Sequence, residues 1–352
     1  MAALTNVNRE REPGYAGLST FCKVPLALYP AELAGADVAI VGAPFDDGVS
    51  NRPGTRFGPR AIRQADNFPL SPPTRPHLGL GIDPFAVLDV VDYGDAECMP
   101  GDLAASHQAI KQRVDEILAA DAIPVILGGD HSVALPDMTA MSERYGRGAV
   151  GVIHLDTHAD TAPALWGLEL SHGSPMRSVV ENGSISGSHF LQFGLRGYFP
   201  DPADFDWMRS VGMRWHTIYD IDDRGFRVCL DELMEDARDL PEHVFLSVDV
   251  DAMCPAFAPG TGTPEPGGLT PRELLAVVRR VCLELPVAGM EVVEVSPPFD
   301  PSGVTALVAH RIVLEALSAI AVRRRGGGPR PELPARQRDK RAGVLHSSTG
   351  TP

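Results

Sequence analysis

The stretch AVGVIHLDTHAD, Ala149–Asp160, joins an apolar, β-branched run to a cluster of acidic and imidazole side chains. The run is apolar at successive rather than alternate positions, which predicts a strand buried on both faces. Asp156, His158 and Asp160 follow two residues apart, so an extended backbone can turn all three toward one point. In open parallel sheets, ligands bind beyond the carboxyl ends of the strands. The end of this strand is therefore a candidate site.

Similar apolar runs recur along the chain and alternate with longer helical patterns, which indicates strands joined by crossover helices. We therefore expect an α/β fold with three layers, α/β/α, around a mostly parallel, doubly wound sheet of about eight strands. The predicted strands are Asp37–Ala43, Val87–Val91, Ala122–Leu127, Ala149–Leu155, His189–Leu195, Met213–Ile218, Val244–Val248 and Val287–Val293. The predicted helices are Leu103–Ala120, Ala134–Tyr145, Pro202–Val211, Leu230–Asp239, Pro271–Leu285 and Thr305–Val322.

Composition divides the chain into three parts. Residues 1–35 predict an N-terminal arm, 36–322 one domain, and 323–352 a basic, disordered tail that is low in apolar residues. The net charge is -15, with +6 on the tail and -21 on the rest. Such an acidic body disfavours nucleic acid and suits a small cationic substrate, unless the carboxylates only keep the protein soluble.

The chain has no apolar run long enough to predict a membrane span. Ala306–Val322 is the most apolar late segment, but it contains His310, Arg311 and Glu315 and predicts a packed amphipathic helix. The five cysteines form no C-x-x-C pair, which fits a reducing cytoplasm.

Two further polar clusters follow predicted strands. Gly128-Gly-Asp-His131-Ser comes after one strand and Asp249-Val-Asp251 ends another. A lone Asp or His in a loop is usually a cap, but three clusters at equivalent strand ends predict a metal site. Oxygen ligands predominate, which favours manganese over zinc, and more ligands are present than one ion needs, which indicates two ions bridged by Asp156 and Asp249. The candidate ligands are His131, Asp156, His158, Asp160, Asp249 and Asp251.

The segments GGDHS, HLDTHADT, SVDVDAMCPAFAPGTGTPEPGG and MEVVEVSPP resemble those of the ureohydrolase (arginase and agmatinase) family, and the resemblance covers roughly residues 37–322. It implies one Mn²⁺ on His131, Asp156, Asp160 and Asp249, and another on His158, Asp156, Asp249 and Asp251. Ni²⁺ is the alternative metal. The resemblance also implies a homo-oligomer, either a trimer or a hexamer.

By position in the same motifs, His172 matches the family's proton-shuttling histidine and Glu294 the carboxylate that holds the guanidinium. The resemblance implies that hydroxide from a metal-activated water attacks the guanidinium carbon, with Asp160 hydrogen-bonded to the nucleophile, so that urea and an amine leave. Two structural alternatives remain. His172 could cap a helix that begins near Ser174, and Glu294 could pair with Arg196.

Substrate choice should depend on the loop between Asp160 and His172, which is mostly apolar. Trp166 and Leu165 could pack an alkyl chain and Glu169 could pair with a distal ammonium, which favours agmatine as substrate and putrescine as product. Ala162 stands where arginases carry an Asn, which disfavours arginine. Guanidinobutyrate, or another guanidine or alkylguanidine, is the alternative, and guanidinobutyrate would need a pocket Arg such as Arg52 or Arg177.

Three further questions stay open at this point. A non-catalytic subunit of a heteromer would lose ligands or His172, whereas this chain keeps them. A zinc deacetylase on a related fold would need only one metal. Cys254 stands where relatives usually carry an Asp, which puts metal affinity in doubt rather than the type of reaction. The glycine- and proline-rich loop Pro259–Gly268 is expected to form a wall of the site and not to bind a phosphate group.

Overall fold

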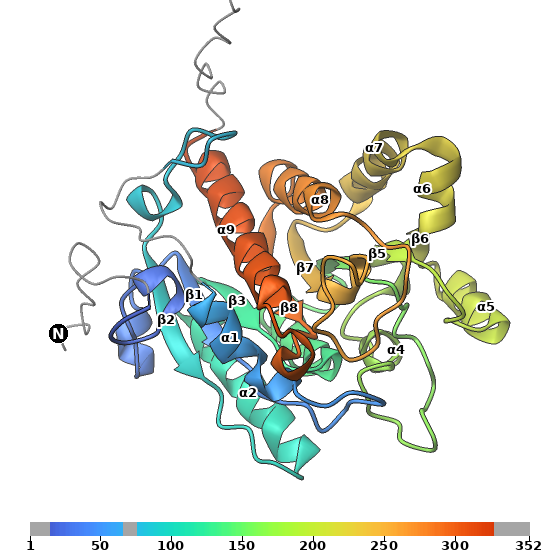
Figure 1. Ribbon diagram of the computed structural model, residues 1–352, viewed down its shortest axis with the longest axis horizontal. Coiled ribbons are helices and arrows are strands. Elements are labelled where there is room, and N and C mark those ends of the chain that lie inside the picture. The colour runs from blue at the N-terminus through green and yellow to red at the C-terminus, as the bar shows by residue number, and fades with distance from the viewer. Residues whose placement is uncertain (1–14, 66–75, 327–352) are drawn as a thin grey trace, which may run out of the picture.

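The computed structural model describes residues 15–65 and 76–326. Within these ranges the chain forms one eight-stranded sheet with the strand order β2-β1-β3-β8-β7-β4-β5-β6 (Figure 1). Every strand pair is parallel. The strands are β1 (Val38–Gly42), β2 (Val90–Asp95), β3 (Ile123–Leu127), β4 (Val150–Leu155), β5 (Phe190–Leu195), β6 (Arg214–Thr217), β7 (His243–Asp249) and β8 (Val287–Val293).

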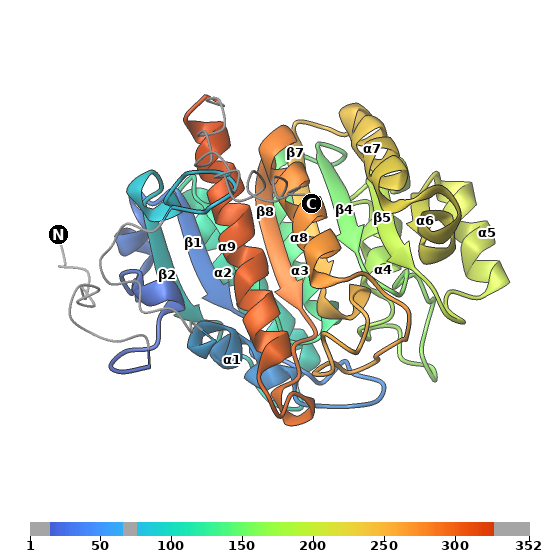
Figure 2. The ribbon, with the colours of Figure 1, turned by 45° about the horizontal axis from the view of Figure 1, so that its top comes forward.

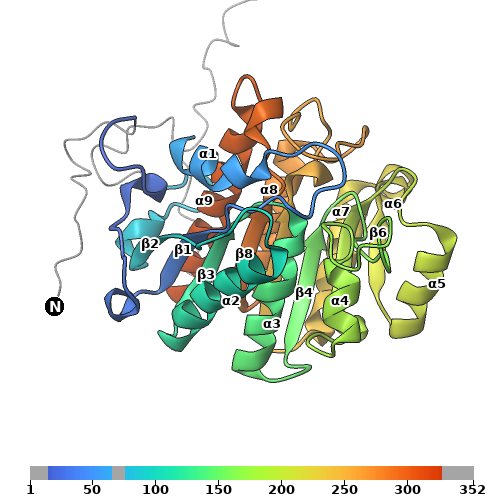
Figure 3. The same cartoon turned by 90° about the horizontal axis from the view of Figure 1, so that it is seen from below.

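Helices cover both faces of the sheet, as the expected three layers require (Figures 2 and 3). One face carries α1 (Gly58–Gln64), α6 (Ile218–Arg224), α7 (Phe226–Asp236), α8 (Pro271–Glu284) and α9 (Val304–Arg324). The other carries α2 (Leu103–Ala119), α3 (Ala134–Tyr145) and α4 (Pro175–Glu181). Helix α5 (Pro202–Val211) lies near the edge formed by β6.

The buried side chains of successive strand residues enter two separate cores. On β4, Ile153 and Leu155 pack with the core beneath α7, α8 and α9, whereas Val150 and Val152 pack with the core beneath α2 and α3. Both faces of the central strands are therefore apolar, which explains why their sequences do not alternate.

The register of the sheet aligns the ends of its four central strands. Leu155 of β4 pairs with Val248 of β7, and Val248 pairs with Val292 of β8. Val292 in turn pairs with Leu127 of β3. The polar residues that follow each of these positions consequently leave the sheet at the same edge and at the same level.

All eight predicted strands are present, and one is displaced along the sequence. The prediction placed the second strand at Val87–Val91, but β2 begins at Val90 because a 3₁₀ turn occupies Pro84–Ala86. The strand then continues through Asp92, whose buried carboxylate pairs with Arg63 at 2.8 Å. Because the charged Asp92 interrupts the apolar run, the sequence pattern did not show where this strand ends.

The expected N-terminal arm joins the body well before residue 36. Phe21 and Leu33 are fully buried, and the backbone of Asp92 on β2 exchanges hydrogen bonds with Pro25 and Ala27. The basic tail lies outside the described residues from 327 onward.

Helix α9 was predicted to be amphipathic, but it is apolar on nearly all sides. An 18-residue stretch of this helix has a mean hydropathy of 1.6, which would suffice for a membrane span, but 72% of the stretch is buried inside the protein. Helices α1 and α8 pack against it. These features are typical of the central helix of a globular core.

Candidate metal centre and substrate cavity

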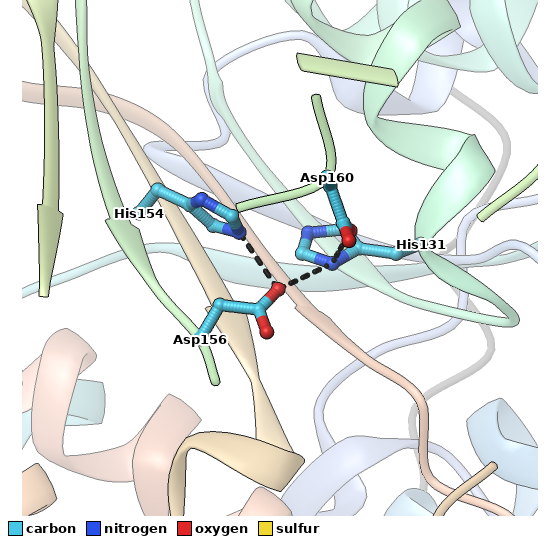
Figure 4. Close-up of side chains that lie close together, drawn as sticks. All are labelled: His131, His154, Asp156 and Asp160. Carbon is cyan, nitrogen blue, oxygen red and sulfur yellow. Dashed lines mark hydrogen bonds and ion pairs between the residues drawn. The ribbon is translucent and has the colours of Figure 1, made fainter. Parts of the chain in front are cut away.

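The first group of candidate ligands converges on one ring nitrogen. Nδ1 of His131, in the turn after β3, lies 3.0 Å from Asp156 Oδ2, 3.0 Å from Asp160 Oδ2 and 3.3 Å from Asp249 Oδ2 (Figure 4 shows the first two aspartates). These three carboxylates are the partners predicted for one metal ion. All four side chains are at least nine-tenths buried.

The second group lies on the other side of Asp156. Nδ1 of His158 is 3.2 Å from Asp251 Oδ2 and 3.7 Å from Asp156 Oδ1. Asp156 therefore offers one oxygen to each group. Asp249 was also expected to serve both, and its second oxygen, Oδ1, accepts the backbone N–H of Asp251 at 2.7 Å, just as Oδ1 of Asp156 accepts that of His158 at 2.6 Å.

The spacing and the burial of these donor atoms suit bound cations. Ligands about 2.1 Å from one octahedral ion lie about 3 Å apart, which is the spacing around His131 Nδ1. Among the described residues, His131 Nδ1 and Asp251 Oδ2 are buried polar atoms without a hydrogen-bond partner. Burial and the charges of neighbouring carboxylates raise the pKa of Asp251 to about 6 and raise that of Asp249 well above its ordinary range. A cation bound here would give the unpartnered atoms a partner and would offset the repulsion between the carboxylates.

The second ring nitrogen of His131, Nε2, faces a serine hydroxyl and a glutamate carboxylate. Its Nε2 lies 2.8 Å from Ser247 Oγ and 3.7 Å from Glu291 Oε1, so Nε2–H can donate while Nδ1 stays free to ligate. Glu291 lies beside Asp137, and both are fully buried. Burial and the charge of Glu291 raise the pKa of Asp137 well above its ordinary value.

Glu294, immediately after β8, lines the cavity described below, and its two oxygens have different surroundings. Oε1 accepts the backbone N–H of His131 and lies 2.9 Å from His172 Nδ1. Oε2 is buried without a hydrogen-bond partner among the described residues. The backbone of Glu294 has φ of 65°, a left-handed value that costs energy for a residue other than glycine and often marks functional positions. Its predicted alternative partner, Arg196, instead donates to backbone carbonyls, including that of Asp251.

His172 is fixed at both ring nitrogens. Nδ1 faces Glu294, while Nε2 accepts the backbone N–H of Ser50 at 3.0 Å and lies 2.6 Å from Ser50 Oγ. Burial lowers the pKa of His172, but the charge of Glu294, the hydrogen bond to it and the charges of Asp130 and Asp160 together outweigh burial and raise the pKa to about 9. The Ser50 backbone donor opposes this rise because it faces Nε2 best when that nitrogen carries no proton.

A cavity opens directly onto these groups. Its walls include Glu294, His172 and several of the candidate ligands, and Thr263 adds the predicted wall from the Pro259–Gly268 loop. The apolar part is formed by Ala162, Leu165, Phe199 and Pro200. These side chains could enclose an alkyl chain of a few carbons.

Two predicted substrate contacts lie elsewhere. Trp166 is 81% exposed, and Glu169 is exposed on the same loop. Neither is among the residues that line the cavity. The neighbouring Leu165 does line it, since its side chain points inward where that of Trp166 points to solvent.

The lining of the cavity also includes Asp204 of α5, which is not among the residues predicted from the sequence. Its Oδ1 lies 3.1 Å from Arg177 Nη2. Arg177 also donates to the Thr161 carbonyl and stacks on Trp207, so its guanidinium is held behind Asp204. Among the described residues, no Lys or Arg lines this cavity, and Arg52 packs instead over the Phe299 ring.

Cys254 is not a cavity residue either. Hydrogen bonds from backbone N–H groups, first that of Ala256, lower the pKa of its thiol, and the charge of Arg196 adds to the effect. Arg196 donates to the carbonyls of Asp251, Ala252 and Met253. Arg196, rather than Cys254, thus supports the backbone of the Asp251 loop.

Comparison with known proteins places these features in a family. Residues 36–319 match the arginase family. The chain is 37% identical to the guanidinobutyrase of Pseudomonas aeruginosa, over 88% of this chain and 94% of that protein. It is 37% identical to the mitochondrial agmatinase of Gallus gallus, over 81% of this chain and 82% of that protein.

The solved structure of proclavaminate amidinohydrolase from Streptomyces clavuligerus superposes with a TM-score of 0.78 at 37% identity. The match covers 88% of this chain and 99% of that one, which confirms the expected arginase-like fold. With the family match over residues 36–319 and this likeness along nearly the whole sheet, the chain belongs to the arginase family.

Proposed function

We propose that this protein is a binuclear manganese hydrolase that releases urea from a guanidino compound with a cationic tail, with agmatine as substrate and putrescine as second product. The observation that carries the proposal is Glu294 Oε2, a buried acceptor without a partner on the wall of a cavity that also contains the His131 cluster. A guanidinium is a cationic hydrogen-bond donor that can pair with this carboxylate, and burial strengthens such a pair.

In this proposal His131, Asp156, Asp160 and Asp249 hold one ion, and His158, Asp156, Asp249 and Asp251 hold the other. The bound ions would lower the pKa of a coordinated water and so supply hydroxide near neutral pH. Asp249 would have to release the Asp251 backbone N–H, or share that oxygen, to serve both ions.

The remaining groups act on the substrate. Glu294 Oε2 orients the guanidinium, and Asp160 lies at the cavity wall where it can accept a hydrogen bond from the nucleophile. His172 Nε2 can take up a proton and return it to the leaving amine, while Nδ1–H stays on Glu294. Loss of the Ser50 N–H bond on protonation would make the proton easier to give away.

Asp204 supports a cationic tail. Its carboxylate stands on the cavity wall with only one oxygen bound by Arg177, and the cavity offers an anionic tail no lining Lys or Arg. We therefore assign to Asp204 the distal contact that the sequence analysis expected of Glu169.

A urea-release assay over a panel of guanidines tests this assignment. The Mn²⁺-loaded protein should have a higher kcat/KM for agmatine than for guanidinobutyrate, and Asp204→Asn should reduce the agmatine value about tenfold or more. The same variant should raise turnover of guanidinobutyrate, because Arg177 is then uncovered. Glu169→Gln is the matched control, since it removes one charge from an exposed residue outside the cavity. Equal losses in both variants, or none for Asp204→Asn, would refute the contact.

Guanidinobutyrate is the second candidate, and one contact favours it. An anionic tail could take the place of the Asp204 carboxylate on Arg177 Nη2, and the guanidinobutyrase of Pseudomonas aeruginosa is among the relatives. In that case the parent protein would prefer guanidinobutyrate, and Arg177→Met would remove the preference. The urea product would be the same.

A further inference from the structure

His154 lies beside the candidate metal centre, although the sequence analysis did not identify it. It is fully buried on β4, two residues before Asp156 and on the same side of the strand (Figure 4). His154 Nε2 is 2.8 Å from Asp156 Oδ2, the oxygen that also faces His131. By distance alone, His154 could be a fifth ligand of the first ion, because its nitrogen falls within the same group of possible donors.

The position of the ring proton decides between ligand and support, and Gln192 on β5 fixes that proton. Gln192 Nε2 lies 2.8 Å from the Ala159 carbonyl and 3.1 Å from His154 Nδ1. A carbonyl only accepts, so the amide group that faces Ala159 must be NH₂. Flipping the amide would place two oxygens 2.8 Å apart, even though Oε1 is now buried without a partner.

The same NH₂ group then donates to His154 Nδ1, which must carry no proton. The proton of the neutral ring is therefore on Nε2, where the carboxylate of Asp156 accepts it. A protonated ring nitrogen has no lone pair to offer a metal. Each contact in the chain from Ala159 through Gln192 and His154 to Asp156 has one donor and one acceptor, and the contacts agree.

We infer that His154 is a positioning residue and not a metal ligand: it holds the carboxylate shared by the two ions, with Gln192 fixing its tautomer. The inference rests on the proposed metal centre. Asp156 is then held at both oxygens, at Oδ2 by His154 Nε2–H and at Oδ1 by the backbone N–H of His158 at 2.6 Å. Because this carboxylate contributes to both groups, its orientation affects both ions at once.

Mn²⁺ affinity of the metal-free protein measures this role directly, through free Mn²⁺ detected by electron paramagnetic resonance during titration. His154→Phe keeps the ring volume but removes the donor, and it should weaken both Mn²⁺ sites about 10–100-fold. His154→Gln, which retains an N–H donor, should recover most of that loss. The matched control is His243→Phe, the same substitution at the start of β7, which should leave both affinities unchanged.

Two results would overturn the inference while leaving the metal centre standing. One is a parent protein that binds two Mn²⁺ ions with the same affinities as His154→Phe. The other is a long-range ¹H–¹⁵N spectrum of the diamagnetic Zn²⁺-loaded protein in which His154 Nε2 carries no proton, as a ligand requires. If the parent binds no pair of ions, the proposed function fails first, so the two failures can be told apart.

Discussion

Glu294 illustrates how one side chain can serve both the fold and the substrate. Its Oε1 is used by the backbone of His131 and by His172, which fixes the carboxylate and leaves Oε2 without a partner among the described residues. The left-handed backbone at this residue is the cost of that orientation. None of its contacts involves a candidate metal ligand's donor atom, so its effect on substrate can be separated from its effect on the metals.

Glu294→Gln should therefore lower kcat/KM for the guanidine about 100-fold or more while the Mn²⁺ content stays at the parent value. The amide keeps the size of the side chain but removes the charge that pairs with the guanidinium. Steady-state kinetics and elemental analysis on the same sample provide the measurement. Unchanged kinetics, or loss of metal in step with activity, would contradict the assigned role.

Asp137 offers a test at the residue scale that is independent of activity. Its raised pKa means that the folded protein keeps a proton that the unfolded chain releases above pH of about 4. The folded state binds more protons, so this residue lowers stability as pH rises from about 4 toward the folded pKa. Asp137→Asn removes the titration and keeps the size of the side chain.

The free energy of unfolding of Asp137→Asn, relative to the parent, should therefore increase between pH 5 and pH 8, with each unit of pKa shift worth about 1.4 kcal/mol. Urea denaturation of the metal-free proteins at the two pH values measures it. Asp206→Asn, on the surface of α5, is the control and should show little dependence on pH. A variant whose relative stability is the same at pH 5 and pH 8 would show that Asp137 is ionised in the fold.

Residue spacing predicted the six candidate ligands, because alternation along a strand is a local rule and each cluster lies within five residues. It did not predict Asp204 or Ser50, which reach the cavity from a helix and a loop whose approach depends on the rest of the fold. His154 follows the same alternation as Asp156 and could have been found. Its place inside an apolar run made it resemble a core residue.

At the scale of elements, the turn after β3 is built by contact between two backbones. A Cβ on Gly129 would lie 1.9 Å from the Phe45 carbonyl oxygen and 2.7 Å from that of Ala43. Neither atom can move without shifting the loop after β1, which also carries the Gly48 and Ser50 contacts to Asp130 and His172. The Gly-Gly pair thus brings the β1 loop against the His131 turn.

Gly129→Ala should destabilise the protein by about 3 kcal/mol or more, since overpacking against backbone leaves no side chain to yield. It should also lower Mn²⁺ content, because His131 follows two residues later. Thermal unfolding and elemental analysis are the measurements. Gly79→Ala is the control, as the nearest atom to its added Cβ is His77 Cε1 at 3.3 Å. A variant as stable as this control would refute the close approach.

Sequence patterns predicted the elements well where core packing and local preference agree, as in α3 and α5, whose bounds match the prediction. They missed α1 and α6 and indicated only the start of α4, near Ser174; each of these helices has seven residues. Seven residues make about two helical turns, too few for an apolar period to stand out, and such helices depend on tertiary packing. Strand order also lay beyond local patterns, since β7 and β8 insert between β3 and β4.

For the whole molecule, that insertion creates the site. Because β3, β8, β7 and β4 are neighbours, the polar residues after all four strands meet at one edge of the sheet. The cost is a buried space rich in carboxylates, visible in the raised pKa values of Asp249 and Asp251. The fold therefore brings together like charges that cations would stabilise, and the central claim is that two cations do so.

The metal content of the saturated protein tests that claim most directly. Purified chain, stripped with a chelator, reloaded with Mn²⁺ and separated from free metal, should contain two ions per chain by elemental analysis, and His131→Ala should retain fewer because it belongs to one group only. A parent chain that saturates at a single ion, or a His131→Ala variant that keeps two at full occupancy, would contradict the binuclear centre.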